Sequence, residues 1–143
     1  MTLKEYQDRA QKQLRLHADQ LDEDLDKTTD LMIAYSGQHS IERSKLKELQ
    51  REYKIKAFER SEFYLGTASP EKYREEPLDR KILKTDVKTW VDTDDEIMEI
   101  QKRIDEQEEI VSFLGDLVDL IRFRNNSIKT RLDIMKWYKG QDL

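Results

Sequence analysis

Apolar residues recur every three or four positions over much of the chain, which is the spacing of one face of an α-helix. The pattern is longest at the C-terminal end, where apolar a and d positions of a heptad repeat run from Ile97 to Met135. It predicts one long helix over residues 93–139, opened by a capping box of Thr93 and Glu96. Asn125 lies at an a position, where a single polar side chain can fix register and oligomeric state.

A second apolar row joins the heptad seam between Ile110 and Phe123, so this helix must contact more than one neighbour. Helices of the same chain or identical subunits could cover it, and the low apolar content of the chain favours identical subunits. We expect a ring- or barrel-like homo-oligomer whose contacts come from the C-terminal helix. The expected contact residues are Ile104, Val111, Leu114, Leu117, Val118, Ile121, Asn125 and Ile128.

The N-terminal region, residues 1–36, begins with a capping box of Thr2 and Glu5 and continues as a helical stripe whose period slips near His17. Between Asp19 and Asp30 it carries six acidic residues and one lysine. A charge run of this kind is usually a solvated helix face, and its functional interpretation is a docking surface for a basic partner.

A second helix is expected within residues 40–66, with Ser40 as its N-cap and Gly66 as its stop. Ser69 and Pro70 then begin a short helix that ends before Pro77. Residues 81–91 change to a period of two, which predicts a short strand paired with the 66–77 loop or with a neighbouring subunit. Together these segments form a mainly α-helical protomer, expected to be one domain over residues 1–143.

Composition narrows the class of protein. Of 143 residues, 40% are charged and 36% hydrophobic, there is no cysteine, and the formal net charge is −5. No apolar run reaches the ~20 residues of a membrane span and no signal peptide opens the chain, so we expect a soluble, intracellular protein without membrane contact.

Catalytic chemistry has little support in the sequence. There is no phosphate-binding glycine loop and no paired histidine motif, and the two histidines, His17 and His39, lack the spacing of metal ligands. We therefore expect no enzyme, no metal and no cofactor.

The second helix carries the most specific signal. Residues 43–60 hold seven basic and three acidic side chains, and Arg43, Lys47, Arg51, Lys54 and Phe58 fall within about 80° of one another around a helix. Such a face is commonly just solvated and paired, as Glu48 could pair with Arg51. The alternative is single-stranded nucleic acid, since phosphates need cations and unstacked bases need a ring.

The nucleic-acid interpretation defines a set of candidate residues on this helix and on the segment that follows it. They are Arg43, Lys47, Arg51, Lys54, Lys56, Phe58, Arg60, Phe63 and Tyr64, with Lys84, Lys88 and Trp90 as an extension.

The run from His39-Ser40-Ile41 through Lys54, Lys56 and Arg60 to Phe63-Tyr64-Leu65-Gly66 resembles the UvsY family of phage recombination mediators. In that family a His-Ser pair precedes a basic helix that ends in two aromatics and a nearby glycine. Leu83 with Asp86, Val91-Asp92-Thr93 and Ile128-Lys129 also match. The family associates DNA binding with a lysine and an arginine two residues apart; the arginine corresponds to Arg60, whereas Phe58 stands at the lysine position. Lys54 or Lys56 would then supply the charge, and Phe58 a stacking ring.

The resemblance implies a non-catalytic mediator that acts in the cytoplasm of an infected bacterial host, in phage homologous recombination and repair. Its implied partners are single-stranded DNA, a RecA-like recombinase, the single-strand-binding protein that the recombinase must displace, and further copies of itself in a hexamer or heptamer. Two other classes remain open on the residues alone. One is a coiled-coil structural adaptor without a nucleic-acid role, and the other is a phage-encoded inhibitor that binds a host protein through its acidic helix.

Overall fold

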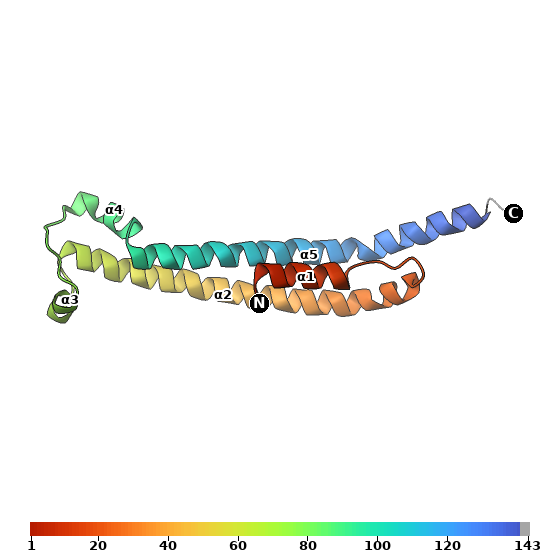
Figure 1. The fold of residues 1–143 in the computed structure, drawn as a ribbon, viewed down its shortest axis with the longest axis horizontal. Coiled ribbons are helices and arrows are strands. Elements are labelled where there is room, and N and C mark those ends of the chain that lie inside the picture. Colours follow the sequence, from red (N-terminus) through yellow and green to blue (C-terminus); the bar gives the residue numbers. More distant parts are fainter. Residues whose placement is uncertain (141–143) are drawn as a thin grey trace. The chain divides into compact units, whose positions relative to one another are not determined.

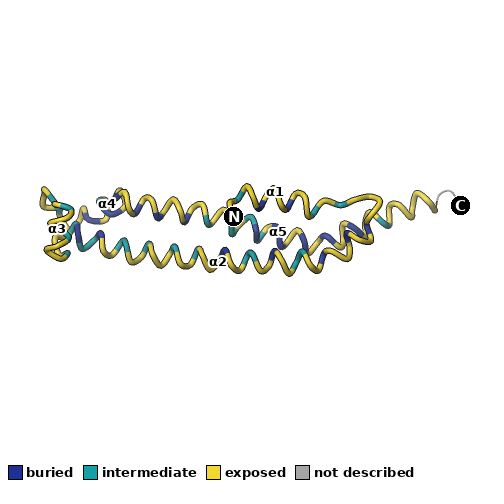
Figure 2. The backbone as a smooth tube through the Cα atoms, turned by 60° about the horizontal axis from the view of Figure 1, so that its bottom comes forward, coloured by how far each residue is buried: buried dark blue, intermediate teal, exposed yellow. Residues whose placement is uncertain are grey.

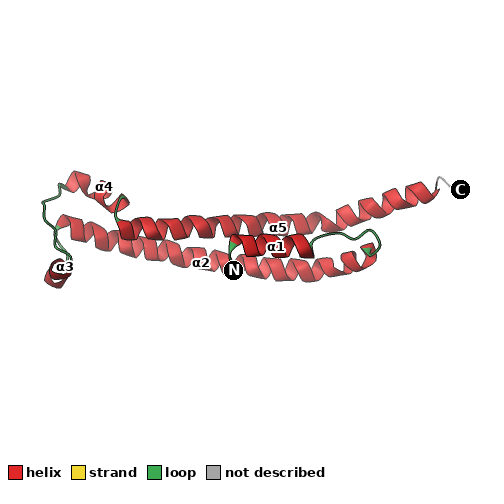
Figure 3. Ribbon diagram, viewed as in Figure 1, coloured by secondary structure: helices red, strands yellow, loops and turns green. Residues whose placement is uncertain are grey.

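The computed structural model describes residues 1–140, and over that range every regular element is helical. The elements are α1 (Leu3–Gln13), α2 (Leu21–Leu65), α3 (Pro70–Glu75), the 3₁₀ turn η1 (Lys84–Asp86), α4 (Val87–Asp92) and α5 (Asp95–Gly140) (Figures 1 and 3). The prediction of a mainly α-helical protomer with a long C-terminal helix is confirmed. Within residues 1–140, no helix combines the length and the apolarity that crossing a membrane requires.

The chain divides into two compact units, each with its own core. The first contains Met1–Arg43 together with the residues from Glu109 onward, and the second contains Ser44–Glu108. Both units take part of α2 and part of α5.

In the first unit, α1 packs with the N-terminal part of α2 and the C-terminal part of α5. Buried positions recur every three or four residues on the facing sides of these helices, as Figure 2 shows. Thr2 and Glu5 form the predicted capping box at the start of α1. The core of this unit consists of Tyr6, Ala10, Tyr35, Leu114, Leu117, Val118 and Ile121.

Two sets of hydrogen-bonded polar side chains fix the helices of the first unit to one another. The Tyr6 hydroxyl donates to Glu42 over 2.8 Å, and burial, followed by this bond, raises the pKa of Tyr6 to about 12. Arg124 of α5 donates to the Thr28 hydroxyl over 2.9 Å and to the backbone carbonyl of Asp24. The backbone N–H of His17 donates to the Asp24 carboxylate over 2.7 Å, which is the largest cause of the lowered pKa of Asp24. The predicted acidic run is therefore only partly a surface, because Asp24 belongs to the core.

The second unit is built around the short helix α4. Val87 and Val91 of α4, with Ile97 of α5, form a buried cluster on which Tyr53, Ala57 and Tyr64 of α2 pack, together with Ile82. The predicted end of α2 and start of α3 are confirmed. Gly66 follows α2 with a positive φ of 82°, and Ser69 caps α3 with Pro70 in its first turn.

The predicted strand over residues 81–91 is wrong, because this segment forms η1 and α4. The period of two placed five β-branched or apolar side chains on one face of a strand. Val87 and Val91 are also four residues apart, which is a helical spacing, and both are buried in the helix. A helix satisfies its own backbone groups, whereas an isolated strand needs a partner strand for its N–H and C=O groups.

Three predicted helix ends also differ. α2 continues through Gly37 and Ser40, so Ser40 is no N-cap. A glycine inside a helix costs about 1 kcal/mol, and the burial of Tyr35, two residues before Gly37, favours the continuous helix. The slip near His17 is a true interruption, since α1 ends at Gln13 and α2 begins at Leu21. At the start of α5 the cap is Asp94 rather than Thr93, because the Asp94 carboxylate accepts from the backbone N–H of Glu96 over 2.9 Å.

Candidate nucleic-acid interface

A row of exposed cations follows one face of α2 in the second unit. Lys47, Arg51, Lys54 and Phe58 are three or four residues apart, lie on the same side of the helix and are all exposed. We call these four residues the α2 stripe. The Phe58 ring is 65% exposed, which is unusual for a phenylalanine and leaves its face free for a ligand.

The charges of the α2 stripe are available to a ligand. Arg51 pairs with Glu48 one turn away, but both side chains are more than half exposed, and surface pairs of this kind are worth about 0–1 kcal/mol. Lys47 and Lys54 make no ion pair within residues 1–140. Arg43, also exposed, lies earlier on α2 and is the last α2 residue of the first unit.

The other side of α2 is covered by protein. Tyr53, Ala57 and Tyr64 face the cluster of α4 and α5. Lys56 is half-buried and lies 3.4 Å from Glu59 and 3.8 Å from Glu96. Its charge is therefore already matched by carboxylates.

Arg60 is buried, with only 4% of its surface exposed, although it is the arginine that the resemblance singled out. Its Nε donates to the Asp94 carboxylate over 2.8 Å, and its two terminal nitrogens donate to the two Glu76 oxygens over 2.9 and 2.8 Å. The Tyr64 hydroxyl donates to the same Asp94 oxygen over 2.6 Å. We call Arg60, Tyr64, Glu76 and Asp94 the Arg60 cluster.

Aromatic rings close the Arg60 cluster on one side. The guanidinium carbon lies 4.3 Å from the centre of the buried Phe63 ring, and Phe63 stacks on Tyr73 with a centroid separation of 5.3 Å. Tyr64 contacts Trp90 with 5.8 Å between ring centroids, and Arg80 lies over the other ring of that pair, Trp90. Phe63 and Tyr64, predicted to contact DNA, therefore pack inside the second unit, and Trp90 is half-buried beside Tyr64.

Two further cations of the candidate set are exposed. Lys84 lies in η1 and Lys88 in α4, one residue after the buried Val87. α4 packs on Tyr53, Ala57 and Tyr64 of α2, so these two lysines belong to the same unit as the α2 stripe. The recess around the Arg60 cluster, about 420 Å³ in volume, is lined by carboxylates as well and does not favour a phosphate.

The Arg60 cluster shifts the pKa values of its members. Hydrogen bonding to Arg60 is the main cause that lowers the pKa of Glu76 from 4.5 to about 2, with Lys72 adding to the effect. The same pairing raises the pKa of Arg60. Burial, followed by the bond to Asp94, raises the pKa of Tyr64.

The low pKa of Glu76 predicts a stability that depends on pH. The folded pKa lies below the unfolded value of 4.5, so the ion pair stabilises the fold above about pH 4.5 and is lost as the pH falls toward 2. In urea unfolding, Glu76→Gln should cost about 1 kcal/mol near pH 7, since partial exposure screens the pair. The difference from the unaltered protein should shrink between about pH 4.5 and 2. Glu75→Gln, at an exposed neighbour, is the matched control, and a difference independent of pH would contradict the assignment.

The residues expected to join subunits are distributed between the interior and the surface. Asn125 is exposed and Val111 is half-buried. The other six are buried within the protomer: Ile104, Leu114, Leu117, Val118, Ile121 and Ile128. The heptad seam of α5 therefore faces helices of its own chain.

Five exposed apolar residues in the C-terminal part of α5 form a different row. Its members lie away from the buried seam and are between 49% and 64% exposed. They are Leu120, Phe123, Ile134, Trp137 and Tyr138, and we call them the α5 row. The second apolar stripe seen in the sequence pointed to Leu120 and Phe123, whereas nothing in the heptad pattern singled out Ile134, Trp137 or Tyr138.

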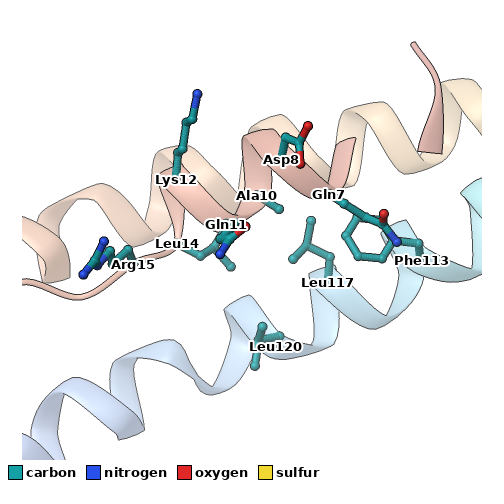
Figure 4. Close-up of a pocket in the computed structure, with 10 residues that line it drawn as sticks. All are labelled: Gln7, Asp8, Ala10, Gln11, Lys12, Leu14, Arg15, Phe113, Leu117 and Leu120. Atoms are coloured by element: carbon teal, nitrogen blue, oxygen red, sulfur yellow. The ribbon is translucent and has the colours of Figure 1, made fainter. Parts of the chain in front are cut away.

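A groove between α1 and α5 in the first unit adjoins the α5 row. It has a volume of about 1060 Å³, an apolar floor and a polar rim that includes Lys12 and Arg15 (Figure 4). Leu120 belongs both to this groove and to the α5 row. The apolar floor consists of Ala10, Leu14, Phe113, Leu117 and Leu120.

Within residues 1–140, no three histidine, aspartate or glutamate side chains lie together in a way that could hold a metal ion. Exposed cations, an exposed ring and an exposed apolar row are features of a binding surface.

Comparison with known proteins gives the family and the fold. The family described as "Recombination, repair and ssDNA binding protein UvsY" matches residues 9–141. Crystal structures of the bacteriophage T4 recombination mediator protein UvsY are similar in fold: one (lattice type II) has a TM-score of 0.85 at 18% identity and covers 98% of this chain and 99% of that one. A second (lattice type I) has a TM-score of 0.81 at 17% identity, with 92% and 97% covered. No curated protein matches the sequence.

Proposed function

Because the chain belongs to the UvsY family of recombination, repair and single-stranded-DNA-binding proteins, we propose that it binds single-stranded DNA along the α2 stripe and acts as a recombination mediator. The family is one of non-catalytic mediators, which agrees with the expectation that this chain is no enzyme. The structurally similar protein is a bacteriophage recombination mediator. We therefore propose that this chain acts in phage recombination and repair, in the cytoplasm of an infected bacterium.

The exposure of Lys47, Lys54 and Phe58 is the observation that carries the proposal. Cations three or four residues apart on a helix can follow a flexible phosphate backbone, and an exposed ring can stack an unpaired base. A duplex hides its base faces, so a surface that combines cations with a ring favours single strands. Each phosphate neutralised on a single strand contributes about 0.7 to the slope of log affinity against log salt, which makes such binding strongly dependent on salt.

Self-association is the second part of the proposal. We propose that the α5 row and the groove beside it join protomers into a ring-like hexamer or heptamer. Phe123 and Trp137 are 64% and 60% exposed, and burying apolar surface of this kind against another copy is favourable by about 25 cal/mol per Å². A ring would present several α2 stripes to one DNA strand and raise the overall affinity through effective concentration.

The mediator step follows from competition for one strand. A RecA-like recombinase and a single-strand-binding protein exclude each other from the same DNA. A third protein shifts that competition only by binding one of the two complexes better than the other. We propose that DNA held along the α2 stripes is a better substrate for the recombinase than for the single-strand-binding protein.

A loading assay tests the mediator role. Single-stranded DNA is first covered with the single-strand-binding protein encoded by the same genome, and the RecA-like recombinase is then added with and without this protein. Filament formation is followed by the DNA-dependent ATP hydrolysis of the recombinase. We expect this protein to shorten the lag before hydrolysis on covered DNA and to have little effect on bare DNA. An unchanged lag at saturating concentrations would contradict the mediator role.

A further inference from the structure

The Arg60 cluster leaves no cation free for a phosphate. The single positive charge of Arg60 faces the carboxylates of Glu76 and Asp94, so the group carries a net charge of −1. The Phe63 ring covers the face of the guanidinium at 4.3 Å, and only 4% of the residue is exposed. A strand of DNA could reach Arg60 only after these bonds were broken, which is costly for a buried pair.

The position of its two carboxylate partners gives Arg60 a different role. Glu76 directly follows α3, and Asp94 directly precedes α5, where it caps the helix. Residues 77–93, which carry Lys84 and Lys88, run from one of these carboxylates to the other. One arginine of α2 therefore fixes both ends of this segment through three hydrogen bonds of 2.8–2.9 Å.

We propose that Arg60 is a positioning residue for DNA binding, which holds residues 77–93 so that Lys84 and Lys88 contact the strand bound on the α2 stripe. This inference rests on the proposed function. Arg60 itself does not touch the DNA. Without the fixed ends, only the apolar contacts around Val87 and Val91 hold this segment, so its two lysines are placed less firmly and must be ordered at the moment of binding. Because ordering flexible groups at the moment of binding opposes association, we expect the loss of these fixed ends to lower the affinity about tenfold.

Glu76→Gln separates positioning from direct contact because the two accounts predict opposite signs. The change removes a negative charge and leaves Arg60 paired with Asp94 alone, so an arginine that contacts phosphate would bind DNA equally well or more tightly. Positioning predicts that affinity for a labelled oligothymidine falls about tenfold. Glu75→Gln makes the same change of charge at an exposed neighbour and should leave affinity within about twofold. Arg60→Lys keeps the charge without the planar fork and should lose as much as Glu76→Gln.

A double-mutant cycle tests whether the Arg60 cluster acts through the two lysines. In a Lys84→Gln, Lys88→Gln background, Glu76→Gln should have less than about a twofold effect, because the groups that it positions are gone. Circular dichroism confirms that each variant is folded. An equal effect of Glu76→Gln in both backgrounds, or wild-type affinity of Arg60→Lys, would overturn the inference. No binding by the unaltered protein would instead overturn the proposed function, and this inference with it.

Discussion

Replacing Lys47, Arg51 and Lys54 by alanine is expected to lower the affinity for oligothymidine by about 100-fold or more at low salt. The three side chains are the exposed cations of the α2 stripe, and none is needed by the core of the second unit. Three lost phosphate contacts should also reduce the slope of log affinity against log salt by about 2. Fluorescence anisotropy across a series of salt concentrations measures both quantities.

The matched control for the α2 stripe changes the same number of charges elsewhere. Lys4, Lys27 and Lys139 are exposed on α1, α2 and α5 and lie outside the α2 stripe. Their replacement by alanine should leave the salt slope within about 0.5 of the original value, since only cations that contact phosphate release counterions. Equal losses in the two triple variants would mean that net charge, and not the α2 stripe, attracts the DNA.

Phe123→Asp combined with Ile134→Asp is expected to convert the assembly into folded monomers. Both side chains are exposed in the protomer, at 64% and 49%, so a charge there disturbs no core of the chain. It would, however, have to be buried in any contact between α5 rows, which is unfavourable without a partner. Affinity for long oligothymidine should fall by about 100-fold or more as the α2 stripes are no longer linked. Sedimentation velocity measures the mass, and circular dichroism the helix content.

Leu114→Asp is expected to unfold the protein instead of separating its subunits. Leu114 is completely buried between α1, α2 and α5 in the first unit, so a charge there should unfold this unit rather than separate subunits. A double variant at Phe123 and Ile134 that kept its mass in solution would contradict the role of the α5 row.

The helical architecture could be predicted because its signals are local. Thr2 with Glu5, Gly66, and Ser69 with Pro70 each act within a few residues, and each of these helix ends is confirmed. The predicted strand over residues 81–91 was wrong because contacts between residues distant in sequence determine the structure of this segment. Val87 and Val91 fit a strand or a helix equally well, and packing on Tyr53 and Ala57 selected the helix.

For the candidate site too, only the features with local signals could be predicted from the sequence. Periodicity alone placed Lys47, Arg51, Lys54 and Phe58 on one face of a helix, and the structure leaves that face exposed. The periodicity could not reveal that Arg60 is buried, because the partners of Arg60, Glu76 and Asp94, lie 16 and 34 residues further along the chain. Nor could a heptad pattern tell whether α5 packs on its own chain or on another copy, because both use the same apolar spacing.

Binding of the unaltered protein to labelled oligothymidine, titrated across salt with unlabelled duplex as competitor, tests the claim that the α2 stripe binds single-stranded DNA. The α2 stripe predicts binding that weakens steeply with salt and that an equal concentration of duplex does not displace. Absence of binding at low salt by the folded, assembled protein would contradict the claim. The exposed cations would then be a solvated helix face, and the chain a structural adaptor.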